Sequence, residues 1–214
     1  MKNEQEVRNI LINNTIRLVA EGGFEKATTK AITFCGENLP DMKMNEVYIY
    51  RLFGSKEHLY EAAFELLDNE LLNALRNRLD ITRASGLSTE EKMHELFIHT
   101  WQFALRNEER CRFYTRYYYS IYFNGESLAK HVKLFEKIVD GFSPFFKKEA
   151  DVGSIMHIVL SMLLDFAIRV YNGDLEDNEI NRPHIFNVLY CVMSSYFNES
   201  FARETGKTSF IEGR

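Results

Sequence analysis

Two short stretches decide the fold of this sequence, LVAEGGFEKATTKAI at residues 18–32 and NEVYIYRLFGSKEHL at residues 45–59. In the first stretch an apolar helix ends at Gly22-Gly23, because glycine seldom continues a helix, and a second helix begins after it. The second stretch carries a third helix, which ends at Gly54, and then opens a long fourth one. Three short helices followed by a long one are typical of a helix-turn-helix domain. The two stretches therefore predict an all-α protein whose first sixty or so residues can bind DNA.

Capping side chains stand where these helices should begin. A hydroxyl of Thr28 or Thr29 can cap the second helix, and Asn45 can cap the third, since each side chain can accept from free backbone N–H groups. Similar reasoning along the rest of the chain gives the expected helices, at residues 3–21, 30–34, 45–53, 55–80, 89–106, 108–123, 127–148, 152–171 and 182–203. We expect about nine helices and no sheet.

Composition agrees with a helical chain of one large domain or two small ones. Only 11 glycines and 3 prolines occur in 214 residues, which favours long helices. Residues 1–60 carry eight basic and eight acidic side chains, so the net charge of −5 belongs to the rest of the chain. We expect a helix-turn-helix domain at residues 1–55, a larger helical domain at 56–205 and a tail at 206–214.

Several features bear on where the protein works. The three cysteines, Cys35, Cys111 and Cys191, are far apart and form no disulfide framework or metal-ligand pattern. We expect no signal peptide and no membrane segment, because no uninterrupted apolar run approaches the length that a membrane helix needs. We therefore expect a cytoplasmic protein. The last four residues, IEGR, resemble a protease site left from expression, and we expect them to play no part in the fold.

The two opening stretches resemble the tetracycline-repressor (TetR) family of transcription regulators. The resemblance covers about residues 7–62 and rests on an apolar first helix, Gly23-Phe24, Thr28-Thr29, Ile32 and the run YIYRLFGSKEHL at 48–59. It implies a DNA-binding head joined to a helical body that binds a small molecule and forms a homodimer.

The helix at residues 45–53 would be the recognition helix. Asn45, Tyr48 and Arg51 lie three residues apart on one face and can meet base edges in the major groove of an operator. Tyr50 and Lys56 can contact phosphates, and Lys56 would do so at the start of the fourth helix.

The same residues also have plainer interpretations. By the resemblance, Thr28, Thr29, Tyr50 and Lys56 occupy backbone-contact positions, and Tyr48 a base-facing one. The threonines could instead only cap their helix, and Lys56 could be merely solvated. Tyr50 could be a core aromatic residue.

The sequence also departs from the family pattern. The turn before Asn45 is longer by about five residues, and Val47 replaces a small residue. Asp41 and Glu46 bring negative charge toward the DNA, which weakens attraction. The leading interpretation is a ligand-responsive DNA-binding repressor. The alternative is a helical small-molecule-binding or interaction protein whose DNA-binding head is weakened.

Aromatic residues crowd the larger domain, where they can line an apolar pocket or simply pack the core. The candidate pocket residues are Trp101, Phe113, Tyr117, Phe135, Met156 and Asp165. Asp165 lies in an apolar stretch, where a carboxylate needs a partner, and Arg169 four residues on is the favoured one. These residues would suit an apolar or aromatic effector.

The last two expected helices are apolar over a wide arc, which favours a homodimer interface over an ordinary core. No phosphate loop, nucleophile elbow or metal-binding spacing occurs in the sequence, so we expect no enzyme, cofactor or metal.

Overall fold

The protein is described by a computed structural model that covers residues 4–34 and 44–198. Those residues form nine α-helices and one short 3-10 helix, and no strand beyond a single bridge between Phe146 and Phe197. The all-α prediction is confirmed. The chain divides into two compact units, Met1–Glu70 with Asn107–Val132 and Leu71–Arg106 with Lys133–Arg214. The predicted boundary at residue 55 differs from this division.

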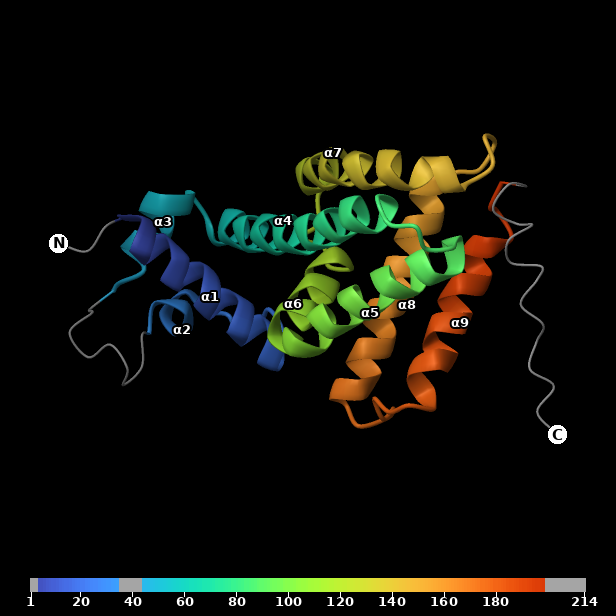
Figure 1. Cartoon of the computed structure of the whole chain (residues 1–214). Helices are drawn as coiled ribbons and strands as arrows, with labels where there is room; N and C mark the ends of the chain where they lie inside the picture. Colours follow the sequence, from blue (N-terminus) through green and yellow to red (C-terminus); the bar gives the residue numbers. More distant parts are fainter. Residues whose placement is uncertain (1–3, 35–43, 199–214) are drawn as a thin grey trace. The chain divides into compact units, whose positions relative to one another are not determined.

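The first unit is built on α1 (Glu4–Gly22), α2 (Thr29–Thr33), α3 (Val47–Phe53) and the start of α4 (Lys56–Arg83). It also contains α6 (Glu108–Tyr118) and the start of α7 (Gly125–Phe142). Helices α1 to α3 lie together in Figure 1, and α6 packs along α1. The side chain of Arg116 on α6 donates to the carbonyl of Val19 at 2.6 Å, near the end of α1. The packing of α6 on α1, with this bond, explains why residues 107–132 belong to the first unit.

Turn chemistry sets the helix ends of the head much as the sequence indicates. Thr28 caps α2 by accepting from the N–H of Ala31 at 3.1 Å. Gly54 ends α3 with a φ of 81°, a conformation that favours glycine. Ser55 accepts from the N–H of His58 at the start of α4. The expected cap at Asn45 is wrong, because α3 begins after Glu46 and has no side-chain cap.

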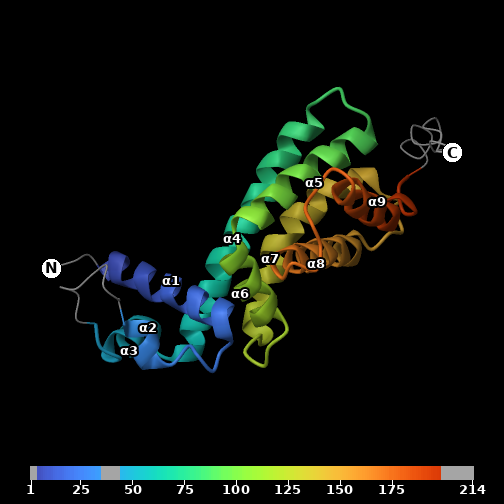
Figure 2. The same cartoon turned by 90° about the horizontal axis from the view of Figure 1, so that it is seen from below.

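The second unit packs α5 (Thr89–Arg106), α8 (Val152–Tyr171) and α9 (Asn181–Ser194) around the later parts of α4 and α7. Helices α8 and α9 run side by side in opposite directions (Figures 1 and 2). Trp101 on α5 donates to Asp177 at 2.9 Å, and Arg182 holds the same carboxylate at 2.8 Å. These bonds fix the turn between α8 and α9 against α5.

Three predicted helix ends are wrong, and local contacts explain each one. Helix α6 ends at Tyr118, where Ser120 bonds back to the carbonyl of Tyr117. Helix α7 ends at Phe142 because Pro144 belongs to the 3-10 turn Ser143–Phe145 that follows. Helix α9 ends at Ser194, and the chain then pairs with Phe146 through Phe197.

Helix α8 is long and apolar enough to cross a bilayer by length and composition, with a mean hydropathy of 1.6. The prediction from uninterrupted runs missed it, because Asp165 and Arg169 break the apolar sequence. The helix packs against α5 and α9, and Val159, Leu163 and Leu164 are among its buried residues. Its apolar character therefore fits the central helix of the second unit.

Candidate nucleic-acid interface and apolar cavity

Helix α3 buries one face and exposes another. Ile49 is fully buried in the head, whereas Tyr50 is 54 % exposed and Arg51 is also exposed. The exposure of Tyr50 argues against its alternative interpretation as a core aromatic residue. Tyr48 is partly buried, and Asn45 is exposed just before the helix. The side chains expected to meet DNA therefore reach the surface, supported by a buried residue between them.

An arginine of α1 fixes the far end of α3. The side chain of Arg8 donates to the carbonyl of Leu52 at 3.1 Å. Its guanidinium carbon lies 4.4 Å from the centre of the Phe53 ring, which is a cation–π contact. The carbonyls in the last turn of a helix have no partner within it, so Arg8 satisfies one of them. Sequence reasoning missed Arg8, although a cation near an apolar helix face is a usable signal.

A hydrogen bond from α4 holds the start of α2 in place. Tyr60, fully buried on α4, donates its hydroxyl to the carbonyl of Ala27 at 3.1 Å. Thr28 follows Ala27 and is exposed, and its oxygen accepts the capping bond while its hydroxyl proton can still be donated. Thr29 is partly buried. Capping and phosphate contact are therefore compatible at Thr28.

Lys56 opens α4 and is partly buried, with its ammonium 5.6 Å from the centre of the Tyr60 ring. This contact distinguishes Lys56 from a merely solvated lysine. The neighbouring Glu57 remains a carboxylate, because hydrogen bonds from its own backbone N–H and from Ser55 lower its pKa. The interface thus holds a cation with a competing negative charge beside it.

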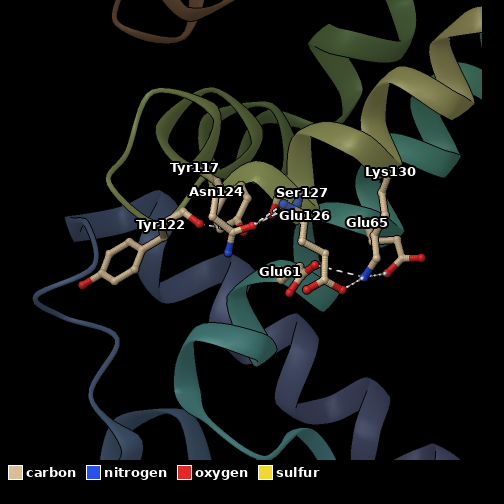
Figure 3. A network of polar contacts seen from close by, with 8 residues as sticks. All are labelled: Glu61, Glu65, Tyr117, Tyr122, Asn124, Glu126, Ser127 and Lys130. Carbon is tan, nitrogen blue, oxygen red and sulfur yellow. Dashed lines mark hydrogen bonds and ion pairs between the residues drawn. The ribbon is translucent and has the colours of Figure 1, made fainter.

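A polar network joins α4, α6 and α7 within the first unit (Figure 3). Lys130 on α7 bonds the buried Glu61 at 2.9 Å and lies 3.7 Å from Glu65 on α4. It also pairs with Glu126 at 3.3 Å. The hydrogen bond to Glu61 is the main cause that raises the pKa of Lys130, so the cation stays charged.

A second buried cluster lies among the same three helices. Nδ1 of His131 on α7 lies 3.0 Å from both carboxylate oxygens of Asp68 on α4. Tyr114 on α6 donates its hydroxyl to the same carboxylate at 3.2 Å. Burial raises the pKa of Tyr114 well above its usual value, so the hydroxyl keeps its proton for this bond. Asp68 is 1 % exposed, and the cluster was not predicted from the sequence.

The second unit contains an apolar cavity of about 50 Å³. Thirteen residues line it: Leu75, Met93, Leu96, Phe97, Thr100, Phe135, Phe142, Met156, Val159, Leu160, Leu163, Leu189 and Met193. Thr100 is the only polar side chain among them, and its hydroxyl is already bonded to the carbonyl of Leu96 at 2.8 Å. None of the lining side chains carries a charge.

The candidate pocket residues divide between three places. Phe135 and Met156 line the cavity. Trp101 is buried in the same unit but does not line the cavity, because its indole N–H bonds Asp177. Phe113 and Tyr117 are buried in the first unit, where Tyr117 contacts Ser127 at 2.8 Å. The pocket was predicted from the many aromatic residues in this part of the sequence, whereas the cavity is lined mainly by aliphatic residues and methionines.

The expectation that Asp165 on α8 lies in an apolar environment is wrong. Asp165 is exposed, so its carboxylate does not need the partner that an apolar environment would require. The favoured pair with Arg169 is wrong as well, because the guanidinium lies over the Phe166 ring at 5.8 Å. No group of three or more metal-ligating side chains occurs within residues 4–34 and 44–198.

Comparison with known proteins shows which of them share this fold. No family model matches the sequence, and no curated protein matches it. A solved TetR-family regulator from Marinobacter aquaeolei VT8 superposes with a TM-score of 0.67 at 16 % identity, over 89 % of this chain and 96 % of that one. The chain has the fold of TetR-family regulators. A TetR-like regulator from Rhodococcus sp. RHA1 gives a TM-score of 0.60 at 16 % identity, over 97 % and 100 % of the two chains.

A third structure with this TetR-type fold is the fatty acid degradation regulator from Bacillus halodurans. It gives a TM-score of 0.59 at 14 % identity, over 85 % of this chain and 96 % of that one. Identities this low establish the shared fold and nothing about individual side chains.

Proposed function

We propose that this protein is a DNA-binding transcriptional regulator of the TetR type, working in the cytoplasm as a homodimer without catalytic activity. The observation that carries the proposal is the exposed face of α3, where Tyr50 and Arg51 reach solvent directly after the buried Ile49. An exposed polar face on a short helix that a neighbouring helix holds in place is what a recognition helix requires.

The candidate DNA-contact residues of the head divide between two roles. Thr28, Thr29, Tyr50 and Lys56 would contact phosphates and set the register on the duplex. Asn45, Tyr48 and Arg51 would face the bases of a double-stranded operator. Two copies would place their recognition helices about 34–36 Å apart, one turn of DNA, on a nearly palindromic site.

We propose that the homodimer forms through α8 and α9. Large apolar side chains remain exposed on these helices in the single chain, including Ile158 on α8 and Val188 on α9. A second copy of the chain that packs over these residues removes their apolar surface from water, which favours the dimer.

The cavity of the second unit supports a ligand response. Its lining favours an uncharged, apolar effector, because a charged group there would lose its hydration without gaining a partner. Met93, Met156 and Met193 have flexible side chains and can repack to enlarge the space. The fatty acid degradation regulator of the same fold is consistent with an apolar effector. We propose repression that the effector relieves by preferring one conformation.

An electrophoretic shift of the full-length protein on pooled genomic fragments tests DNA binding. We expect retarded fragments at low salt and weaker binding for Tyr50→Ala and Lys56→Ala. Lys137→Ala is the matched control, since Lys137 is an exposed lysine of the second unit. No retarded fragment at low salt would reject the proposal.

A second candidate is a helical small-molecule-binding protein with a weakened head. Its specific support is Glu46, an exposed carboxylate at the start of α3, together with the balanced charge of residues 1–60. The long turn that also favours it lies at residues 36–43, outside the described residues. Saturable binding of apolar molecules by a protein that retards no DNA would favour this candidate.

A further inference from the structure

Two of the candidate base-facing side chains contact each other. The guanidinium carbon of Arg51 lies 4.6 Å from the centre of the Tyr48 ring, one helical turn earlier on α3. Side chains three apart on a helix are neighbours, and an arginine over a tyrosine ring makes a favourable cation–π contact. The contact restricts where the Arg51 guanidinium can lie.

The stack directs the guanidinium toward the start of α3. Long side chains on a helix lean toward its N-terminus, so Arg51 reaches back over Tyr48 although it stands in the last turn. The N-terminal residues of a recognition helix are the ones that meet base edges in the major groove. The stack therefore carries a cation from the end of α3 to the part of the helix that can read bases.

The edge of this guanidinium is available for recognition. Arg51 is exposed, and no ion pair or hydrogen bond to a carboxylate engages it within the part of the chain that the structure describes. Contact with a ring face leaves the N–H groups in the guanidinium plane free to donate. Those groups form a rigid fork, which fits two acceptors side by side.

We propose that Arg51, supported by Tyr48, reads a guanine in each half-site of the operator. The N7 and O6 acceptors of guanine form the pair that an arginine fork fits best among the base edges of the major groove. This inference rests on the proposed DNA-binding function and names the base that the head selects. Tyr48 acts as a positioning residue, and Arg51 supplies the contact that determines specificity.

Selection from a random-sequence duplex library by the full-length protein tests the assignment. Wild-type protein should select a fixed guanine in each half-site. Arg51→Ala should lose that preference at one position per half-site, by about 5- to 150-fold in discrimination, while the other positions stay fixed. Arg51→Lys keeps the charge but loses the fork, so it should relax the same position.

Lys56→Ala provides the matched comparison, because it also removes one positive charge from the head. It should weaken binding evenly across sequences and reduce the salt slope by about 1 per copy, or about 2 in the dimer, leaving the selected guanine unchanged. If Arg51→Ala behaves in this way, Arg51 contacts a phosphate and the inference is overturned. If wild-type protein selects no sequence at all, the proposed function fails, which is a distinguishable result.

Variants of Tyr48 test the supporting role separately. Tyr48→Phe keeps the ring and should retain the guanine preference, whereas Tyr48→Leu removes the ring and should weaken that preference. Circular dichroism checks that each variant is folded, since Tyr48 is partly buried. Equal guanine preference in a folded Tyr48→Leu protein would contradict the positioning role.

Discussion

Replacing His131 with leucine should destabilise the protein strongly. The carboxylate of Asp68 is 1 % exposed, and both of its oxygens lie 3.0 Å from Nδ1 of His131. In the variant, the hydroxyl of Tyr114 at 3.2 Å would be the remaining partner among these three residues. Breaking a buried pair on one side typically costs about 3–5 kcal/mol, a large part of the 5–15 kcal/mol that usually stabilises a protein.

The matched control removes all three polar groups together. The triple variant Asp68→Leu, His131→Leu, Tyr114→Phe leaves no orphaned charge or hydroxyl among these three residues, so it should recover most of the loss. Urea unfolding of the full-length protein, followed by circular dichroism, measures both variants. A single His131→Leu variant within about 1 kcal/mol of wild type would refute the reasoning, because the pair would then contribute little.

Further predictions concern the head, the second unit and its cavity. Arg8→Ala should lower DNA affinity while changing the melting temperature little, because it frees the end of α3. A DNA affinity equal to that of wild type would contradict this. Tyr190→Phe should leave stability unchanged or raise it by about 1 kcal/mol in urea unfolding, since its buried hydroxyl has no hydrogen-bond partner among residues 4–34 and 44–198. The pKa of Asp177 is lowered mainly by the hydrogen bond from Arg182. Its carboxylate should therefore stabilise the folded protein above the ordinary pKa of 3.8, and this stabilisation should be lost as the pH falls below 3.8. Fluorescence of Trp101, the single tryptophan, should report that acid transition, and Asp177→Asn should abolish it. Met156→Trp should fill the cavity and abolish binding of apolar probes in a dye-displacement titration.

Local chemistry made most helix boundaries of the fold predictable. Thr28, Ser55 and Gly54 act at the positions where the sequence indicates caps and breaks. Ser88 and Glu91 form the reciprocal bonds of a capping box at the start of α5. Such signals depend on residues within one turn of each other, so the sequence alone contains them.

Contacts between distant residues account for what the sequence did not reveal. The end of α9 depends on pairing between Phe146 and Phe197, and the buried cluster joins Asp68 to His131 across 63 positions. Neither pair has a local pattern. Most of the cavity lining was not predicted for a related reason, because it comes from α4, α5, α7, α8 and α9. Aromatic density along the sequence could not show which faces of those helices meet.

The residues of the head show both what the sequence predicts and what it does not. The exposed positions of Tyr50 and Arg51 follow from helical periodicity around Ile49. The clamp by Arg8 on α3 does not, since it joins residues 44 positions apart. Periodicity therefore identified which residues face outward, while the structure identified what holds them there.

The dependence of DNA affinity on salt tests the central claim most directly. For the full-length protein on its best genomic fragment, a plot of log affinity against log salt concentration should fall with a slope of about −2 or steeper, because Lys56 of two copies would each neutralise a phosphate. The slope should become shallower by about 2 in the Lys56→Ala dimer. A flat plot, or no binding at low salt, would contradict the account.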